Sequence, residues 1–253
     1  MRLDYPTFDM KRILFSLLLG IAFVVATTGA EAKTYLVAVG ISDYPGSAND
    51  LRHPTDDVHL VVNTYKGLSA DMSFVQLFDN KATINNILNA VQSVFSKAGA
   101  DDIVVLYISG HGYEGGFVAY DGFLAWDRLR KAVGKCRSKR KMIFADTCFS
   151  GTFRSRKNVN NSTSTRPKSD VMLFLSSRSN ETSAESGSLK QGVFSAFLCS
   201  GLRGRADANR DKVVSAKELY NYVHSGVVRK TAGRQHPVMW GNFSSNMPVI
   251  KLK

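Results

Sequence analysis

Apolar positions along the chain form two kinds of pattern, short continuous runs and stripes with a period near 3.6 residues. The runs are typical of strands buried on both faces, and they lie at 34–41, 73–78, 102–109, 141–146 and 171–177. The stripes lie at 55–66 and 83–95 and predict amphipathic helices, and two further helices are predicted at about 193–202 and 215–230. Strands that alternate with helices predict an α/β sandwich around a largely parallel sheet.

Capping and turn residues mark several of the boundaries between these elements. Thr55 and Thr83 stand where a helix needs an N-cap. Asp121-Gly122 is a hairpin signal, and a basic helix is predicted from there to about Lys135. Residues 247–252 predict a closing strand.

The N-terminal segment has the pattern of a secretory signal. Arg2, Lys11 and Arg12 precede an apolar run at 13–26, and Ala30-Glu31-Ala32 follows as an Ala-x-Ala cleavage site. We therefore expect residues 1–32 to be a signal peptide, residues 33–253 to be the mature domain, and the protein to be exported to the periplasm or secreted. An uncleaved membrane anchor is the alternative, but the run is shorter than the roughly 18 residues of a spanning helix. No stable membrane span is expected after the signal is removed.

The composition is that of a globular protein with a local excess of positive charge. Hydrophobic residues make up 44% and charged residues 21%, which excludes a disordered chain, and three cysteines are too few for a disulfide framework. The net charge is +12, and between Arg128 and Lys168 there are 13 basic residues against the single acid Asp146. The rest of the chain holds 20 basic and 20 acidic residues, so the excess belongs to one window. Within that window, residues 154–170 are polar and lack apolar periodicity, and we expect them to form a flexible basic linker loop.

A histidine and a cysteine directly follow two of the predicted buried strands. His111 lies in the Ser-Gly-His-Gly sequence of residues 109–112, and Cys148 lies in the Asp-Thr-Cys-Phe-Ser-Gly sequence of residues 146–151. The carboxyl ends of parallel strands meet at one sheet edge, so the two side chains face each other if their strands are neighbours. A thiol needs an adjacent base to become a thiolate near neutral pH. The alternative is a buried cysteine and a surface histidine that never meet.

Together these two motifs resemble the catalytic core of the caspase-like cysteine peptidases, in the metacaspase and bacterial caspase-homologue branch. Residues 51–58 (Leu-Arg-His-Pro-Thr-Asp-Asp-Val) are similar to the stretch that follows the first strand in that branch. The resemblance implies a caspase-like three-layer α/β/α sandwich with a mostly parallel central sheet of about six strands. It also implies that Cys148 is the nucleophile, that His111 is the general base and that no cofactor is required.

The same resemblance suggests further site residues. The backbone N–H groups of Gly112 and Cys148 match the oxyanion hole. Asp57 and Asp146 match the acidic pocket that binds an Arg or Lys side chain before the scissile bond (the P1 residue), and carboxylates suit a guanidinium. The alternative for Asp57 is a helix-dipole partner in the first turn of its helix.

Three positions depart from the family pattern near this pocket. His53 stands where the branch has Gly, and Asp56 stands where it has Asn, so the shape of the pocket is open. Arg52 is close enough in sequence that a preference for an acidic P1 residue also stays open.

A second motif, at residues 207–218, has the spacing of oxygen ligands in a calcium-binding loop. The candidate Ca²⁺ ligands are Asp207, Asn209, Asp211, Val213 through its carbonyl, Ser215 and Glu218. Lys212, however, stands where the loop needs Gly. The alternative is a helix-initiating loop in which Ser215 caps the next helix and Glu218 completes a capping box.

Two other functions compete with peptidase activity. Cys148 to Arg154 has the Cys-x5-Arg form of a cysteine phosphatase loop, although no helical pattern follows it. A non-catalytic basic binding module is the second, but the window has few aromatic residues for base stacking, which makes nucleic acid an unlikely partner. Export would also permit a disulfide between Cys136 and Cys199.

These observations favour a cysteine endopeptidase that acts on protein or peptide substrates and cuts after Arg or Lys. The linker at 154–170 contains five basic residues, so self-cleavage there is a further expectation.

Overall fold

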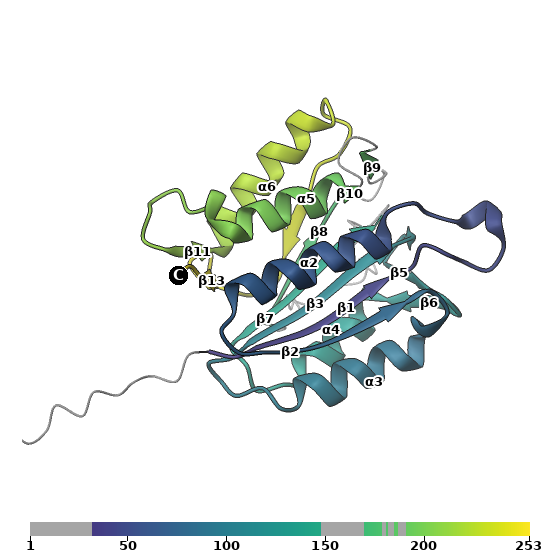
Figure 1. Cartoon of the computed structure of the whole chain (residues 1–253), viewed down its shortest axis with the longest axis horizontal. Helices are drawn as coiled ribbons and strands as arrows, with labels where there is room; N and C mark the ends of the chain where they lie inside the picture. The colour runs from purple at the N-terminus through teal and green to yellow at the C-terminus, as the bar shows by residue number, and fades with distance from the viewer. Residues whose placement is uncertain (1–31, 148–169, 179–180, 182–184, 187–190) are drawn as a thin grey trace, which may run out of the picture. The chain divides into compact units, whose positions relative to one another are not determined.

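A six-stranded sheet forms the centre of the fold, with the strand order β12-β8-β7-β3-β1-β2 (Figure 1). The computed structural model describes residues 32–147, 170–178, 181, 185–186 and 191–253. The strands of this sheet are β1 (Thr34–Gly40), β2 (Met72–Phe78), β3 (Ile103–Gly110), β7 (Arg140–Thr147), β8 (Val171–Leu175) and β12 (Val238–Trp240). All neighbours pair in parallel except β12, which is antiparallel to β8.

The central strands are apolar on both faces because helices cover both sides of the sheet. β1, β3 and β8 are buried along their whole length. One face is covered by α2 (Pro54–Leu68), α5 (Val193–Ser200) and α6 (Ala216–Lys230), and the other by α3 (Ile84–Phe95) and α4 (Trp126–Gly134) (Figure 1). The predicted three-layer α/β/α sandwich is therefore confirmed.

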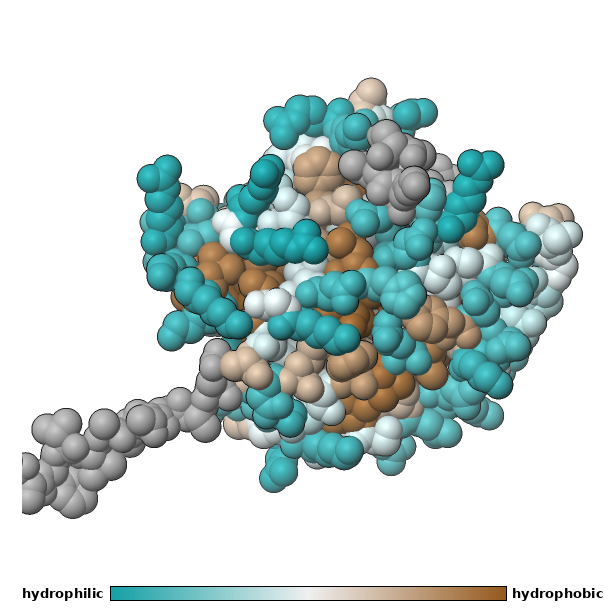
Figure 2. All heavy atoms as spheres, in the orientation of Figure 1, coloured by the Kyte–Doolittle hydropathy of each residue, from teal (hydrophilic) through white to brown (hydrophobic). Residues whose placement is uncertain are grey.

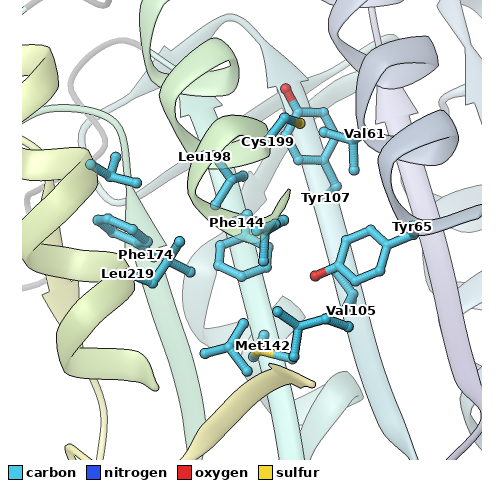
Figure 3. Close-up of a cluster of buried hydrophobic side chains, with 14 of the residues drawn as sticks. Val61, Tyr65, Val105, Tyr107, Met142, Phe144, Phe174, Leu198, Cys199 and Leu219 are labelled. Carbon is cyan, nitrogen blue, oxygen red and sulfur yellow. The ribbon is translucent and has the colours of Figure 1, made fainter. Parts of the chain in front are cut away.

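Large aromatic side chains fill the layer between the sheet and the α2, α5 and α6 face. Tyr65, Tyr107, Phe144 and Phe174 are fully buried there (Figure 3). Phe174 also meets Phe194 edge-on, with ring centroids 5.1 Å apart. Burial of each such side chain stabilises the fold by about 1.5–3 kcal/mol. On the face shown in Figure 2, apolar surface appears in patches separated by hydrophilic side chains.

Three smaller sheets and three short helices complete the described structure. The small sheets are β4 (Gly112–Tyr113) with β5 (Gly116–Ala119) and β6 (Gly122–Ala125), β9 (Glu185–Ser186) with β10 (Gln191–Gly192), and β11 (Val213–Ser215) with β13 (Pro248–Lys251). The short helices are η1 (Ser47–Asn49), η2 (Asp79–Lys81) and η3 (Gly201–Arg205). The predicted hairpin at Asp121-Gly122 joins β5 to β6.

Two sequence-based expectations need correction. The predicted closing strand at 247–252 forms as β13, but it pairs with β11 outside the central sheet, and β12 takes the edge position beside β8. A strand of three residues such as β12 is too short to show a period. The second correction is that Thr55 does not cap α2, because the helix begins at Pro54 with His53 as N-cap. Proline suits the first helical position, where an N–H is not needed.

Two predicted segments lie largely outside the described residues. The predicted signal peptide, residues 1–32, is described only at its last residue. The predicted linker, residues 154–170, is described only at Asp170, whose carboxylate pairs with Lys141 at 2.6 Å. Where the structure describes the chain, none of its helices has the length and apolar character needed to cross a membrane.

Candidate active site

The pairing register of β3 and β7 brings the two predicted catalytic motifs to one edge of the sheet. The last two residue pairs of this ladder are Ser109 with Asp146 and Gly110 with Thr147. The residues that follow this final pair in the sequence are His111 and Cys148. Cys148 itself lies outside the described residues, so the structure places its predecessor and not the thiol.

The His111 ring is held by a backbone carbonyl from a distant loop. Its Nε2 atom lies 2.7 Å from the carbonyl oxygen of Asn49. Because a carbonyl can only accept a hydrogen bond, Nε2 must carry a proton. A neutral imidazole therefore keeps its lone pair on Nδ1, and this nitrogen is the one that can take up a proton.

Tyr44 supports the backbone of the same histidine. The Tyr44 hydroxyl accepts a hydrogen bond of 2.8 Å from the His111 N–H and donates one of 3.0 Å to the Val118 carbonyl. Its ring lies against the imidazole, with centroids 4.7 Å apart. Burial raises the pKa of Tyr44, so the hydroxyl stays neutral and can fill both roles. Neither Asn49 nor Tyr44 carries a signal in the sequence that could have identified it.

A side chain at position 110 would collide with Tyr44, so this position requires glycine. Its φ is +154°, and a Cβ at this position would lie 2.6 Å from the Tyr44 hydroxyl oxygen. The glycine before His111 therefore makes room for the tyrosine that supports the histidine.

Replacing Tyr44 with phenylalanine is expected to lower kcat about tenfold with little change in KM. The variant keeps the ring against His111 but removes the hydroxyl between the His111 N–H and the Val118 carbonyl, so the imidazole is held less well. Steady-state kinetics on a fluorogenic peptide measures this. Tyr113→Phe, at a side chain that is 67% exposed, is the matched control. A Tyr44→Phe enzyme with unchanged kcat would show that the hydroxyl serves stability alone.

A hollow of about 460 Å³ opens beside His111. Its lining includes Tyr44, Asn49, His111, Gly112 and Tyr120. Gly112 directly follows the histidine and begins β4, opposite Phe117 of β5. His111 and Gly112 therefore border the same hollow.

The two predicted pocket carboxylates are both buried and hydrogen-bonded. Asp57 is 2% exposed and accepts hydrogen bonds of 2.9 Å from the Gly192 N–H and from the Ser109 hydroxyl. Asp146 is 5% exposed and accepts from the Ser195 N–H at 3.2 Å and the Ser195 hydroxyl at 2.7 Å. Asp57 does lie in the first turn of α2, but its carboxylate reaches across to β3 and to the segment before α5.

Gly192 shows how close these two carboxylates are. A Cβ on Gly192 would lie 2.2 Å from Asp146 Oδ2 and 3.0 Å from Asp57 Oδ2. Burial raises the pKa of nearby Tyr107 well above its ordinary value, and the charges of Asp57 and Asp146 raise it further. Two carboxylates at one point suit a cationic group such as a guanidinium. Gly192 and Ser195, which donate hydrogen bonds to these carboxylates, were not identified from the sequence.

Two of the departures from the family pattern are exposed, unlike Asp57 and Asp146. The Asp56 carboxylate is 3.3 Å from His53 Nδ1, and its side chain is 54% exposed. Arg52 is also exposed. Adjacent residues of one helical turn therefore differ in surroundings, since Asp56 faces His53 near the surface and Asp57 is buried.

In the predicted calcium loop, several of the candidate oxygen atoms accept hydrogen bonds from the loop's own backbone. Asp207 accepts from the Lys212 N–H, Asn209 from the Asp211 N–H, and Asp211 from the Val213 N–H. Across the residues that the structure describes, no group of three or more His, Cys, Asp or Glu side chains is placed to hold a metal ion. Calcium binding stays a prediction, while the alternative capping box of Ser215 and Glu218 is present.

Replacing Ser215 with alanine is expected to destabilise the protein by about 1 kcal/mol, because the first turn of α6 loses its cap. The melting temperature should fall by roughly 2–4 °C in a thermal unfolding experiment. Ser225→Ala, an exposed position in the middle of the same helix, is the control and should change little. Repeating the scans with millimolar CaCl₂ tests the metal, since a bound ion would raise the melting temperature of the native protein.

Cys136 and Cys199 lie on opposite faces of the sheet. Cys199 is buried in the core beneath α2, α5 and α6 (Figure 3), whereas Cys136 packs against the core beneath α3 and α4. Both are free thiols, so the disulfide that export would permit is not formed. Burial raises the pKa of Cys199 to about 12 and also raises the pKa of Cys136, which makes both weak nucleophiles at neutral pH.

A mostly parallel sheet with a histidine after one central strand and a cysteine after its neighbour defines the class of caspase-like α/β proteins. The family model described as the caspase domain, Peptidase_C14, matches residues 33–247, and the chain belongs to this family of peptidases. No curated protein matches the chain.

Solved structures share this fold at low sequence identity. A structural-genomics target protein from Geobacter sulfurreducens has a TM-score of 0.63 and 17% identity over 87% of this chain and 100% of its own. Caspase-1 from Spodoptera frugiperda has a TM-score of 0.65 and 16% identity over 88% of this chain and 92% of its own.

Proposed function

We propose that this caspase-family protein is a cysteine endopeptidase in which Cys148 is the nucleophile and His111 the general base. The observation that carries the proposal is the pairing register of β3 and β7. The last residue pair of this ladder is Gly110 with Thr147, and the next residues along the two strands are His111 and Cys148. The hydrogen bond from His111 Nε2 to the Asn49 carbonyl adds support, because it leaves Nδ1 as the basic nitrogen.

In the proposed reaction, His111 Nδ1 takes the proton of the Cys148 thiol as the sulfur attacks the scissile carbonyl carbon. The carbonyl oxygen becomes an oxyanion that the N–H groups of Gly112 and Cys148 would bind. Collapse of this intermediate breaks the C–N bond, and His111 gives its proton to the leaving amine. Water then hydrolyses the thioester, with His111 acting again as base, and the free thiol returns.

We further propose that the enzyme cuts after Arg or Lys. Asp57 and Asp146 support this specificity, since both are buried and an oxygen of each lies within 3.0 Å of the point where a Cβ on Gly192 would stand. A cationic P1 side chain would be attracted by the negative charge of two adjacent carboxylates. A substrate with an acidic P1 residue would add a third negative charge to the same place.

A P1-scanned peptide library tests the proposal directly. Wild-type protein and Cys148→Ala are compared on peptides that differ only in the residue before the scissile bond, with and without a chelator. We expect cleavage after Arg and Lys by the wild type alone, unaffected by the chelator. Equal cleavage by both proteins would exclude Cys148 as the nucleophile, and cleavage after Asp or Glu would exclude the pocket assignment.

The two competing functions gain no support from the family. The phosphatase alternative rests on Cys148 to Arg154, which lies outside the described residues, and the buried Asp146 carboxylate would repel a phosphate. A phosphate ester hydrolysed in place of an Arg-ending amide would reverse this ranking. A basic binding module would keep its activity in Cys148→Ala and lose it at high salt.

Self-cleavage within 154–170 is an expected outcome of the proposed specificity. The basic residues there are Arg154, Arg156, Lys157, Arg166 and Lys168. Intact-mass spectrometry of the purified wild type should show fragments that end at one of them. Cys148→Ala should keep its full mass, and identical masses for both proteins would refute self-cleavage. We also propose export, for which a mature chain beginning at Lys33 in the same spectra would be the sign.

A further inference from the structure

A hollow of about 420 Å³ lies between α3 and α4, on the sheet face that does not carry α2. Figure 1 shows both helices on this side of the sheet. Its apolar floor consists of Leu88, Val91, Phe95, Ala132 and Cys136. We call this hollow and its rim the α3/α4 groove. An open hollow with an apolar floor offers a place for an apolar side chain of another molecule.

The rim of the α3/α4 groove is basic. Arg128, Lys131 and Lys135 line it, and all three are exposed. Their spacing of three and four residues places them along one face of the helix. α3 contributes no charged residue to the groove, because its sequence Ile84–Phe95 contains none.

Among the described residues, these three cations have no carboxylate partner. No ion pair found in the described part of the chain involves Arg128, Lys131 or Lys135. Asp127 is the one acidic residue of α4, and its carboxylate is bonded to Arg130 at 2.9 Å, away from the groove lining.

Helix stability alone does not account for this arrangement. Lys131 and Lys135 lie near the C-terminal end of α4, where the helix dipole favours cations. Arg128 is in the first turn, where the dipole favours an acidic residue instead. The position of Arg128 is therefore explained better by a ligand of the groove than by the stability of α4.

We propose that the α3/α4 groove binds an acidic peptide segment of a partner protein, which places an apolar side chain on the floor and carboxylates against the basic rim. A helical rise of about 1.5 Å per residue puts Arg128 and Lys135 about 10 Å apart along α4. An extended segment spans that distance with about three residues, so acidic residues would flank the apolar anchor on both sides.

The burial of the apolar side chains in the groove favours a peptide over a membrane or a nucleic acid as the anionic partner. A membrane surface is bound by protruding apolar side chains, and the large exposed hydrophobic residues in the described structure are Phe74, Tyr113 and Phe123, none of which lines the groove. Single-stranded nucleic acid stacks its bases on exposed aromatic rings. Phe95, the aromatic residue of the lining, is 1% exposed.

Cys136 provides a reporter at the floor of the groove. The test uses the full chain with Cys148→Ala, so that the probe is not cleaved and the proposed nucleophile does not react. The probe is a synthetic peptide of about 12 residues with a central Phe between Asp and Glu residues. The rate of Cys136 alkylation is measured by mass spectrometry. The reaction is run at alkaline pH, because burial raises the pKa of the Cys136 thiol. Cys199 is fully buried and should stay unmodified.

We expect saturating probe to slow Cys136 alkylation at least fivefold, and less so at high salt. Adding R128E, K131E and K135E should abolish this protection, measured as the ratio of rates with and without probe. The control K217E, R229E and K230E makes the same change of charge at exposed positions of α6 and should leave the protection intact. Ala132→Trp, which fills the hollow, should weaken binding of a fluorescein-labelled probe in an anisotropy titration.

Several results would overturn the proposal. Absence of protection would exclude the groove as a peptide site, and equal protection by a probe with Ser in place of Phe would exclude the apolar anchor. Protection by vesicles of 70% phosphatidylcholine and 30% phosphatidylserine, or by oligo(dT), but not by the probe would assign the groove to a membrane or to nucleic acid. Because the test uses the Cys148→Ala protein, its result is independent of whether the protein is a peptidase.

Discussion

Replacing His111 with alanine is expected to lower kcat about 10³-fold or more. The variant removes both the base that would form the Cys148 thiolate and the acid that would protonate the leaving amine, and such proton transfers contribute about 10²–10⁴-fold. Stopped assays on an Arg-ending peptide measure the loss. The effect should be much larger than that of Tyr44→Phe, which leaves the imidazole in place.

A second readout separates catalysis from folding. In His111→Ala the Cys148 thiol should titrate near the ordinary value of about 8.5, so its alkylation should accelerate as the pH rises through that value. In the wild type the reaction should already be faster than in the variant at neutral pH, because His111 can accept the thiol proton as the sulfur reacts. His59→Ala, at an exposed histidine of α2, is the control and should match the wild type in both assays. Normal turnover by His111→Ala would remove His111 from the mechanism.

The double substitution of Asp57→Asn and Asp146→Asn is expected to lower kcat/KM for an Arg substrate about 100-fold. A hydrogen bond to a charged group is worth about 1.5–3 kcal/mol, and about 1.4 kcal/mol corresponds to a factor of ten. A matched substrate with citrulline, which has the shape of Arg without its charge, should lose far less. The ratio of the two kcat/KM values is therefore the measurement.

Controls for this prediction come from the same helical turn. Asp56→Asn removes an exposed carboxylate next to Asp57 and should keep the preference for Arg over citrulline. The asparagine oxygens can still accept from the Gly192 and Ser195 N–H groups, and thermal unfolding shows whether the double variant is folded. A folded double variant with the same Arg to citrulline ratio would place the P1 pocket elsewhere.

Most elements of the fold could be predicted from local pattern because burial leaves a direct record in the sequence. β3 is apolar throughout since helices cover both of its faces, and α3 shows a stripe since one side faces solvent. The Ser215 and Glu218 capping box was also predictable, because it depends on residues three positions apart. β12 was not, because its three residues are held by pairing with β8.

Some residues of the candidate site could likewise be recognised in the sequence, and others could not. The positions of His111 and Cys148 after two apolar strands could be recognised, and so could Asp57 and Asp146 by resemblance. Asn49 and Tyr44 could not, since a backbone carbonyl has no sequence signature and a tyrosine has many roles. Their bonds to His111 join residues 62 and 67 positions apart.

By itself, the sequence determined the kind of each long element, the concentration of positive charge in one window and the candidate nucleophile and base. The tertiary structure decided that β3 and β7 are neighbours, that Asp57 and Asp146 meet at Gly192 and that Cys136 and Cys199 are separated by the sheet. The tertiary structure also places Arg128, Lys131 and Lys135, which belong to the basic window, at the rim of the α3/α4 groove. The physical reason is that hydrophobic period and capping act within a few residues, whereas strand order and the contacts of buried carboxylates depend on how distant segments pack together.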